Sequence, residues 1–247
     1  MSILSNVATD EITHNEVDSL GGNGPIPSGL YLFKITLAYL EQAASGAIAV
    51  CLNLCSESEE IEHKLWIQSG QKRGCKNYYE DKKTGAKKYL PGYNAANNLA
   101  LLTVGKELKN LVEEEKVLNL YSREAGKKIP TKAPVLTELI GQDILAGVIR
   151  DKRNAQVQAS DGQWEDDPSG KTKEDNEIDK FFRAQDRLTV AEIKNELKTG
   201  EFATVWEQKW SNKDRNKVRP IKASEKTSAG FSASAKPTES LFTPAQS

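Results

Sequence analysis

Long apolar runs are missing from this 247-residue sequence. A membrane-spanning helix needs about 18 consecutive apolar residues, and the basic start and apolar stretch of a secretory signal are absent as well. Cysteine is also scarce, since the three residues form an odd number that argues against a disulfide framework. We therefore expect an intracellular protein outside the membrane, with free thiols in a reducing compartment.

Catalytic motifs are missing too. The sequence has no serine or cysteine motif of the nucleophilic type, no phosphate-binding glycine loop and only two histidines, His14 and His63. Cys51, Cys55, Cys75 and His63 have the residue types of a zinc site. The Cys51-x3-Cys55 spacing, however, falls inside a strand pattern and not on a tight C-x2-C knuckle. We expect no enzyme, no metal and no cofactor, and we interpret the cysteines as small buried residues.

Charge is segregated along the chain, although the net charge is only -1. Residues 1–24 contain four acidic residues and no Lys or Arg. Residues 71–93 contain seven basic residues and two acidic ones, a local excess of five positive charges. The overall charge argues against a nucleic-acid partner, whereas this local excess favours one.

Alternating apolar residues predict several short strands, and helical spacing predicts a few helices between and after them. This pattern predicts a mostly β protein with added helices, in the form of a small β-barrel of the oligonucleotide-binding (OB) type. Periodicity leaves other small barrels and sandwiches open. The predicted strands are residues 31–37, 48–54, 61–68, 117–121 and 142–150, with a hairpin of residues 78–79 and 87–90; the predicted helices are residues 94–104, 136–140, 190–197 and 202–210.

Turn residues and composition divide the chain into four parts. A loop is expected around Pro130 and Pro134, and a loop or an extended excursion is expected over residues 156–179, which are acidic and rich in breakers. The C-terminal part is too poor in apolar residues to fold. The predicted parts are a flexible acidic arm (1–24), an OB-fold-like DNA-binding domain (25–155), an acidic loop with a helical extension (156–223) and a disordered tail (224–247).

The most informative segment interleaves cations with tyrosines in the predicted hairpin. Single-stranded nucleic acid presents phosphates and splayed bases, so a protein that binds it needs a basic groove and flat stacking platforms. The alternative is a surface hairpin that is charged for solubility, with half-buried tyrosines. The candidate DNA-binding residues here are Lys72, Arg73, Lys76, Tyr78, Tyr79, Lys82, Lys83, Lys87, Lys88, Tyr89 and Tyr93.

Four further residues are candidates for the same surface. Trp66 is either another stacking platform or a core residue. Arg150, Lys152 and Arg153 follow a predicted strand, where they either extend the groove or form a solvated strand end.

Four segments carry a resemblance: residues 89–97 (YLPGYNAAN), 103–106 (TVGK), 134–141 (PVLTELIG) and 174–182 (EDNEIDKFF). Together they resemble bacteriophage single-stranded DNA-binding proteins with an OB fold. The resemblance implies a protein without a cofactor that coats and protects single-stranded DNA, largely without sequence preference. It also implies a role in phage DNA replication and recombination, in the cytoplasm of the infected host cell.

The C-terminal tail departs from that family's pattern, because residues 224–247 balance two acidic residues with two basic ones. Leu241 and Phe242 remain candidates for docking phage replication or recombination proteins.

Two other functions stay open. One is a metal-dependent nuclease or nuclease subunit that uses carboxylates of residues 161–179. The other is a protein-binding scaffold or inhibitor of a replication complex that uses Phe202, Trp206 and Trp210.

Overall fold

The computed structural model describes residues 24–122, 125–159 and 163–221. The predicted arm, apart from its last residue, and the predicted tail with Leu241 and Phe242 lie outside these ranges. Within the described residues, no helix is both long enough and apolar enough to span a membrane.

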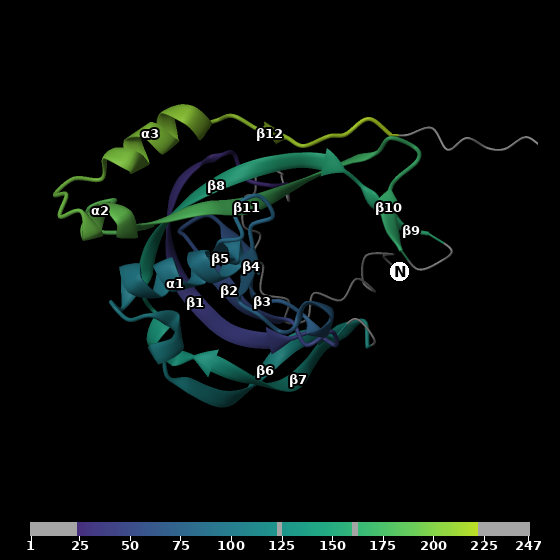
Figure 1. Ribbon diagram of the computed structural model, residues 1–247, viewed down its shortest axis with the longest axis horizontal. Coiled ribbons are helices and arrows are strands. Elements are labelled where there is room, and N and C mark those ends of the chain that lie inside the picture. The colour runs from purple at the N-terminus through teal and green to yellow at the C-terminus, as the bar shows by residue number, and fades with distance from the viewer. Residues whose placement is uncertain (1–23, 123–124, 160–162, 222–247) are drawn as a thin grey trace, which may run out of the picture.

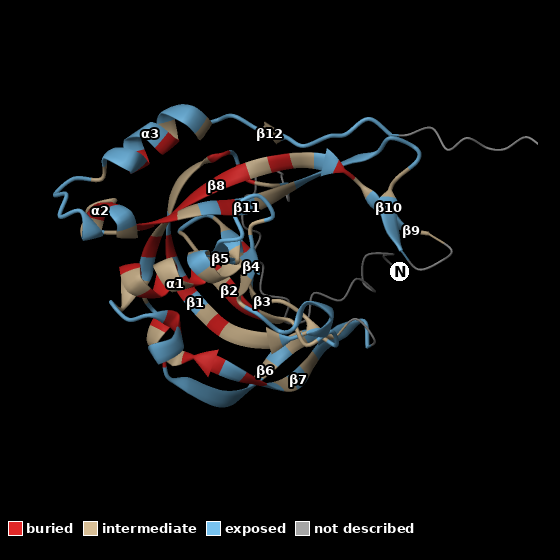
Figure 2. Ribbon diagram, in the orientation of Figure 1, coloured by how far each residue is buried: buried red, intermediate tan, exposed pale blue. Residues whose placement is uncertain are grey.

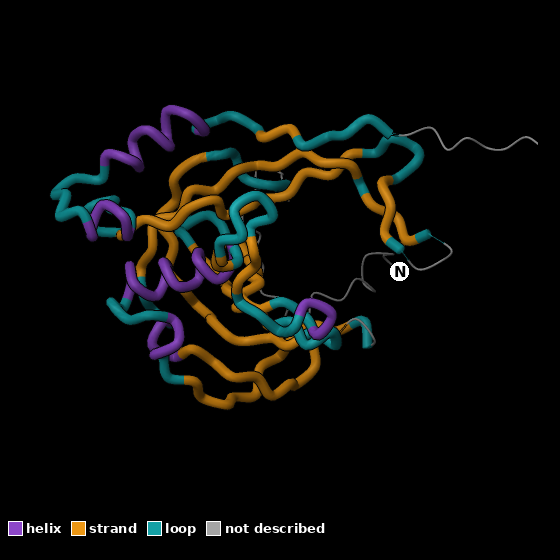
Figure 3. The backbone as a smooth tube through the Cα atoms, viewed as in Figure 1, coloured by secondary structure: helices purple, strands orange, loops and turns teal. Residues whose placement is uncertain are grey.

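The structure is mostly β, and one curved sheet forms its centre (Figure 1). The helices and the smaller hairpins lie around this sheet, as the tube in Figure 3 shows. The strands of the main sheet are β1 (Gly29–Gln42), β2 (Ile48–Cys55), β3 (Glu60–Gln68), β6 (Glu113–Ser122), β7 (Lys127–Leu136), β8 (Asp143–Asn154), β11 (Thr172–Arg183) and β12 (Arg215–Asn216).

Strand order along the sheet is β11-β8-β1-β2-β3, and each neighbouring pair is antiparallel. The long strand β1 pairs with β8 through its first half and meets β7 at Tyr39 and Val135 near its other end. The end strands β3 and β11 are not hydrogen-bonded to each other. The sheet is therefore curved but not closed into a barrel.

Three helices and two small hairpins complete the described part of the chain, and the predicted strands and helices are confirmed to within a few residues. The helices are α1 (Pro91–Thr103), α2 (Val190–Lys194) and α3 (Glu201–Trp210), and short 3-10 turns cover Gln71–Arg73, Leu108–Asn110 and Thr137–Leu139. The hairpins are β4 (Tyr78–Glu80) with β5 (Lys87–Tyr89), and β9 (Gln156–Gln158) with β10 (Trp164–Asp166).

The main core lies between the concave face of the sheet and α1 (Figure 2). Phe33, Ile35 and Ile144 point into it from alternate positions of their strands, and Leu99 meets them from the helix. All four side chains are fully buried. Alternation along the strands and helical spacing along α1 thus produce one shared apolar interior.

A second core covers the opposite face of the sheet and is built by α3. Ile149, Phe182 and Trp206 form it, and the indole of Trp206 lies flat on Gly147. A Cβ atom at Gly147 would lie 2.7 Å from that ring, so only glycine permits this approach. The predicted helical extension is therefore packed on the sheet.

The predicted capping box at the start of α2 is confirmed. The Glu192 amide donates to Thr189 Oγ1 at 3.2 Å, and the Thr189 amide donates to Glu192 Oε2 at 2.8 Å. Glu192 Oε1 also accepts from the Phe202 amide at 2.8 Å. One carboxylate thereby joins the first turns of α2 and α3.

Of the two alternatives predicted for residues 156–179, the loop is wrong, because this region contains the extended strands β9, β10 and most of β11. Strand β11 pairs with β8 over its whole length, so the sheet continues beyond the predicted boundary at residue 155. The first half of β11 is a run of charged residues, in which Glu174 faces Lys152 across the ladder and Asp175 pairs with Arg153, a diagonal neighbour on β8. Cross-strand charge pairs, and not an apolar face, stabilise this half, so apolar alternation could not predict it.

The predicted loop around Pro130 and Pro134 is also wrong, since both prolines lie within β7. They face Asn119 and Glu115 of β6 in the ladder. Beyond its single contact with β1, β7 has β6 as its neighbour on one side only. Proline is tolerated in such an edge strand, where a missing amide donor faces away from the ladder.

Candidate nucleic-acid interface

The predicted basic hairpin forms as β4 and β5, in a small sheet of its own. Its turn is built by Asp81, whose Oδ1 accepts from the amides of Lys83 and Thr84 at 2.9 and 3.3 Å. Gly85 has a φ of +66°, a left-handed conformation that closes the turn. Lys88 Nζ lies 2.5 Å from Asp81 Oδ2 and ties the second strand to this turn.

Cross-strand register sorts the tyrosines of the hairpin onto two faces. Tyr78 pairs directly with Tyr89, so the two rings share one face, whereas Tyr79 pairs with Lys88 on the other. Tyr93, in the first turn of α1, stacks on Tyr89 with ring centroids 4.9 Å apart. We call the face of Tyr78, Tyr89 and Tyr93 the tyrosine face.

Two lysines lie over the tyrosine face. Lys76 Nζ and Lys87 Nζ are 5.5 and 5.2 Å from the centroid of the Tyr78 ring. Tyr89 is 54% exposed, which leaves its ring open to a stacking partner. Of the seven cations in this segment, Lys88 is ion-paired, and the others make no ion pair with described residues: Lys72, Arg73, Lys76, Lys82, Lys83 and Lys87.

The loop that leads into the hairpin is fixed to the turn between β1 and β2. The Gln71 amide donates to the Ser45 carbonyl at 2.7 Å, and the Ser69 amide donates to the Lys76 carbonyl at 2.8 Å. A Cβ atom at Gly70 would lie 2.7 Å from the Ser45 carbonyl oxygen. The basic loop is thus held close to the β1–β2 turn by backbone contacts that only a glycine allows.

Trp66 lies on the solvent side of β3 and is 44% exposed, so it is not a core residue. Lys64, two positions earlier on the same face, places its ammonium 5.7 Å from the indole centroid. This pair repeats the cation-and-ring arrangement of the tyrosine face on a neighbouring element.

A cavity of about 950 Å³ adjoins this region. Its walls are β3, the basic loop, the first turn of α1 and residues 177–179 of β11. It therefore lies between β3 and β11, the two end strands of the path β11-β8-β1-β2-β3. His63 lines it, and burial lowers the pKa of this imidazole to about 4, which keeps it neutral near pH 7.

Arg150, Lys152 and Arg153 stand on β8, in another sheet from the hairpin, and each faces a carboxylate. Arg150 binds Asp214 through two hydrogen bonds of 2.8 and 3.0 Å. Arg153 pairs with Asp175, and Lys152 Nζ lies 3.6 Å from Glu174. These ion pairs leave the three cations less available to phosphate than those of the hairpin.

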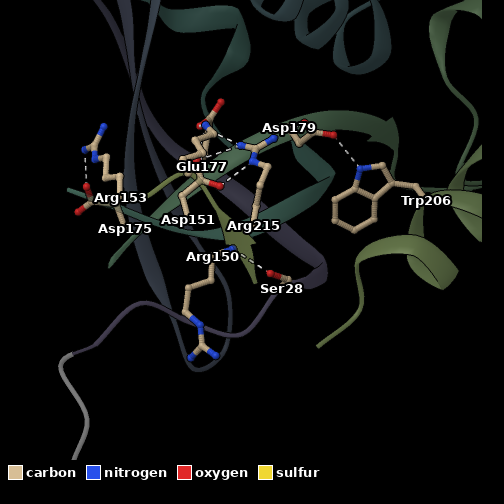
Figure 4. Close-up of polar contacts among 10 residues, drawn as sticks. Ser28, Arg150, Asp151, Arg153, Asp175, Glu177, Asp179, Trp206 and Arg215 are labelled. Atoms are coloured by element: carbon tan, nitrogen blue, oxygen red, sulfur yellow. Dashed lines mark hydrogen bonds and ion pairs between the residues drawn. The ribbon is translucent and has the colours of Figure 1, made fainter. Parts of the chain in front are cut away.

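A buried ion cluster explains the basic residues near the end of the described chain (Figure 4). Asp151, Glu177 and Asp179 converge on the guanidinium of Arg215, whereas the side chain of Arg150 points the other way (Figure 4). The Asp151 carboxylate accepts from Arg215 Nε at 2.7 Å and lies 2.5 Å from Lys217 Nζ. The cluster fastens β12 beside β8.

The ion cluster also sets the protonation of its central carboxylate. Burial raises the pKa of Asp151, but hydrogen bonds from Arg215 and Lys217 outweigh burial and lower the pKa to about 2. On the far side of the cluster, Asp179 accepts from the indole Nε1 of Trp206 at 2.9 Å. These carboxylates are occupied by internal partners.

Two of the carboxylates considered for a nuclease, Asp166 and Asp175, are likewise engaged by basic side chains. Asp166 pairs with Arg219 at 2.9 Å, and Asp175 pairs with Arg153 and Lys173. Across the described residues, no group of three or more His, Cys, Asp or Glu side chains is arranged to hold a metal ion.

The cysteines considered for zinc differ in their surroundings. Cys51 is buried in β2, where burial raises its pKa to about 11, while Cys75 is exposed in the basic loop. Cys55 is half-buried at the end of β2, and its thiol donates to the Ser56 carbonyl at 3.3 Å.

Sequence reasoning missed the β6–β7 hairpin as a possible contact surface. Its outer half is open to solvent, with Val117 and Tyr121 exposed by 64% and 66%. Tyr121 pairs with Lys128 and is followed by the pair of Ser122 with Lys127. The signal in the sequence was Tyr121 close to Lys127 and Lys128. Pro130 and Pro134 led to the prediction of a loop in this region, so the hairpin was not recognised.

The aromatic residues considered for protein binding point mostly inward. Trp206 is 3% exposed, and Trp210 packs against the same core. Phe202 and Val205 are the exposed apolar residues of α3. The surface that this helix offers to a partner is therefore smaller than its sequence predicts.

No protein-family model matches this chain, and no curated protein matches it.

Proposed function

We propose that this chain binds single-stranded DNA through the tyrosine face and the basic loop. The observation that carries the proposal is the combination of exposed rings with six cations that have no ion-pair partner among the described residues. Rings stack on bases of any sequence, and lysines attract phosphates of any sequence, so binding is largely sequence-independent. No reaction is needed, and the protein acts as a binding protein and not as an enzyme.

The strand order supports a partly open OB fold for this function. An OB fold is a five-stranded, partly open Greek-key barrel that binds oligonucleotides on the face of its second and third strands and through neighbouring loops. Here β1, β2 and β3 follow one another, α1 comes next, and β8 and β11 complete the path. The β1–β2 turn, β3 and the basic loop lie together, as this mode of binding requires.

The resemblance to phage single-stranded DNA-binding proteins supports the biological setting of the proposal. We propose a role in phage DNA replication and recombination in the cytoplasm of the infected cell. Phage proteins that act on the same DNA are its proposed partners, with Leu241 and Phe242 as the proposed docking residues. The nuclease alternative is less well supported, because Asp166, Asp175 and Asp179 are held in ion pairs.

Salt titration of binding tests the proposal. Binding of a 30-nucleotide oligo-dT is measured by fluorescence quenching from 50 to 300 mM salt. The logarithm of the binding constant is expected to fall linearly with the logarithm of the salt concentration. Duplex DNA and RNA of equal length measure selectivity. Absence of quenching and of any other binding signal at low salt would contradict the proposal.

Charge-matched variants locate the surface. Replacing Lys76, Lys83 and Lys87 with alanine is expected to reduce the salt slope by about 0.7 per lost phosphate contact, or about 2 in all. The control replaces three exposed lysines elsewhere, Lys34, Lys194 and Lys198, and so changes the net charge equally. Equal slopes for the two variants would show that the groove lies on another face.

A further inference from the structure

The cavity between β3 and β11 runs along strand edges. It is lined by consecutive residues, 63–66 of β3 and 177–179 of β11. Side chains alternate between the two faces of a strand, so consecutive residues can share one wall only along the edge, where the backbone N–H and C=O groups point. Among the described residues, β3 pairs with β2 alone and β11 with β8 alone. Two strand edges without a ladder partner therefore border the same space.

The direction of the strands defines what fits there. Each pair along β11-β8-β1-β2-β3 is antiparallel, so the two end strands run in the same direction. One extended segment running opposite to both would hydrogen-bond on each side. That segment would close the sheet with the alternation of directions kept throughout.

The size of the space fits a short strand. Neighbouring strands lie about 4.8 Å apart, packed sheets lie about 10 Å apart, and a strand rises about 3.3 Å per residue. The product of these lengths is a volume of about 160 Å³ per residue. A cavity of about 950 Å³ therefore holds about six residues. At one end, the space is limited by α1, because Gly92 lies so close to Trp66 that a Cβ atom would be 2.3 Å from its carbonyl oxygen.

The chain's own N-terminal region offers a segment of that length. Residues 3–9 (ILSNVAT) contain no charge, glycine or proline, and Ile, Val and Thr favour strands. The described chain begins beside the cavity, because Ile26 exchanges two hydrogen bonds with the side chain of Asn176, next to residues 177–179. Residues 10–25, which we call the linker, separate this segment from Ile26, and a random coil of 16 residues has a mean span of about 20 to 24 Å.

Charge supports the same occupant. The linker carries four acidic residues and no basic ones. Lys72 and Arg73 line the cavity and make no ion pair with described residues, while Glu177 and Asp179, which also line it, are neutralised by Arg215 at 2.9 and 3.2 Å. An acidic linker that leaves the cavity would meet these cations.

We infer that residues 3–9 insert between β3 and β11 of the same molecule as an additional strand, antiparallel to both. The inserted strand satisfies the two free edges and completes the barrel.

Hydrogen exchange of the full chain without DNA tests the inference. A proline at position 7 removes an amide donor and interrupts the inserted strand. Val7→Pro is expected to raise the exchange rate of amides in residues 60–68 and 172–183 at least fivefold. The matched control, Thr13→Pro, lies in the linker and is expected to exchange as the unsubstituted chain does.

Three outcomes would overturn the inference. The first is equal exchange in the unsubstituted chain and Val7→Pro, and the second is equal acceleration by both prolines. The third is protection that disappears when the protein is diluted a hundredfold, which would show insertion into a second copy. Because DNA is absent from the experiment, these outcomes are separate from a failure of the proposed function.

Discussion

Single residues of the β4–β5 hairpin have different surroundings although they are of one type. Tyr79 and Tyr89 are both exposed, by 45% and 54%, but they point to opposite faces of the hairpin. Only Tyr89 stacks on Tyr93 and shares its face with Tyr78 and Lys87. A comparison of substitutions at Tyr79 and Tyr89 therefore distinguishes binding by the tyrosine face from a general effect of exposed rings.

Removing one ring should weaken DNA binding by an amount that depends on its face. Tyr89→Ala is expected to cost about 1 to 3 kcal/mol of binding free energy, because a base loses its stacking platform. Tyr79→Ala is the matched control and should change affinity much less. Titration of both variants with oligo-dT measures the difference. An equal or larger loss of affinity in Tyr79→Ala would show that the tyrosine face is not the binding face.

Helix α3 depends on close packing, because its Trp206 lies against Gly147 of β8. Gly147→Ala places a methyl group 2.7 Å from the indole, and the helix must move away. We expect a loss of about 1 to 3 kcal/mol in the free energy of unfolding, as for other overpacked cores. Gly24→Ala is the control, since a Cβ atom there meets nothing within 4 Å.

Thermal or urea unfolding of the two glycine variants checks this expectation. For a chain of this length, each kcal/mol corresponds to about 2 to 4 °C in Tm. If Gly147→Ala unfolded at the temperature of Gly24→Ala, α3 would not be held against the sheet by this contact.

The elements also show where sequence patterns succeed. Strands β1, β2 and β3 alternate apolar and polar residues, and the capping box marks the start of α2, so both are readable from sequence. Strand β11 is not, because cross-strand ion pairs hold its first half. Strand β7 is not, because its prolines stand at a sheet edge.

At the scale of the whole molecule, the buried ion cluster links stability to pH. The pKa of Asp151 falls from 3.8 to about 2 on folding, so the unfolded chain binds more protons between these values. The contribution of Asp151 to the free energy of unfolding is therefore fully present above about pH 4 and is lost as the pH falls through about 2. The contribution of this group is on the order of 2 kcal/mol.

Unfolding measured at pH 7, 4 and 2 checks this linkage. Asp151→Asn is expected to lower stability at pH 7, because Arg215 and Lys217 lose their buried partner, and to flatten the decline between pH 4 and 2. Asp143→Asn, which removes an exposed ion pair with Lys34, is the control and should leave the decline intact. A decline of equal slope in both variants would show that other carboxylates set the acid stability.

The sequence by itself determined the β-rich class, the first three strands, α1 and the basic hairpin, because each depends on contacts between residues close in the chain. Only the tertiary structure decided which of the candidate cations keep no ion pair. Arg150, Lys152 and Arg153 look as basic in sequence as Lys76 and Lys87, but the first three meet carboxylates from β11 and the C-terminal segment. Pairing between distant strands brings those charges together, and no local pattern encodes it. The same long-range pairing leaves the edges of β3 and β11 facing one cavity.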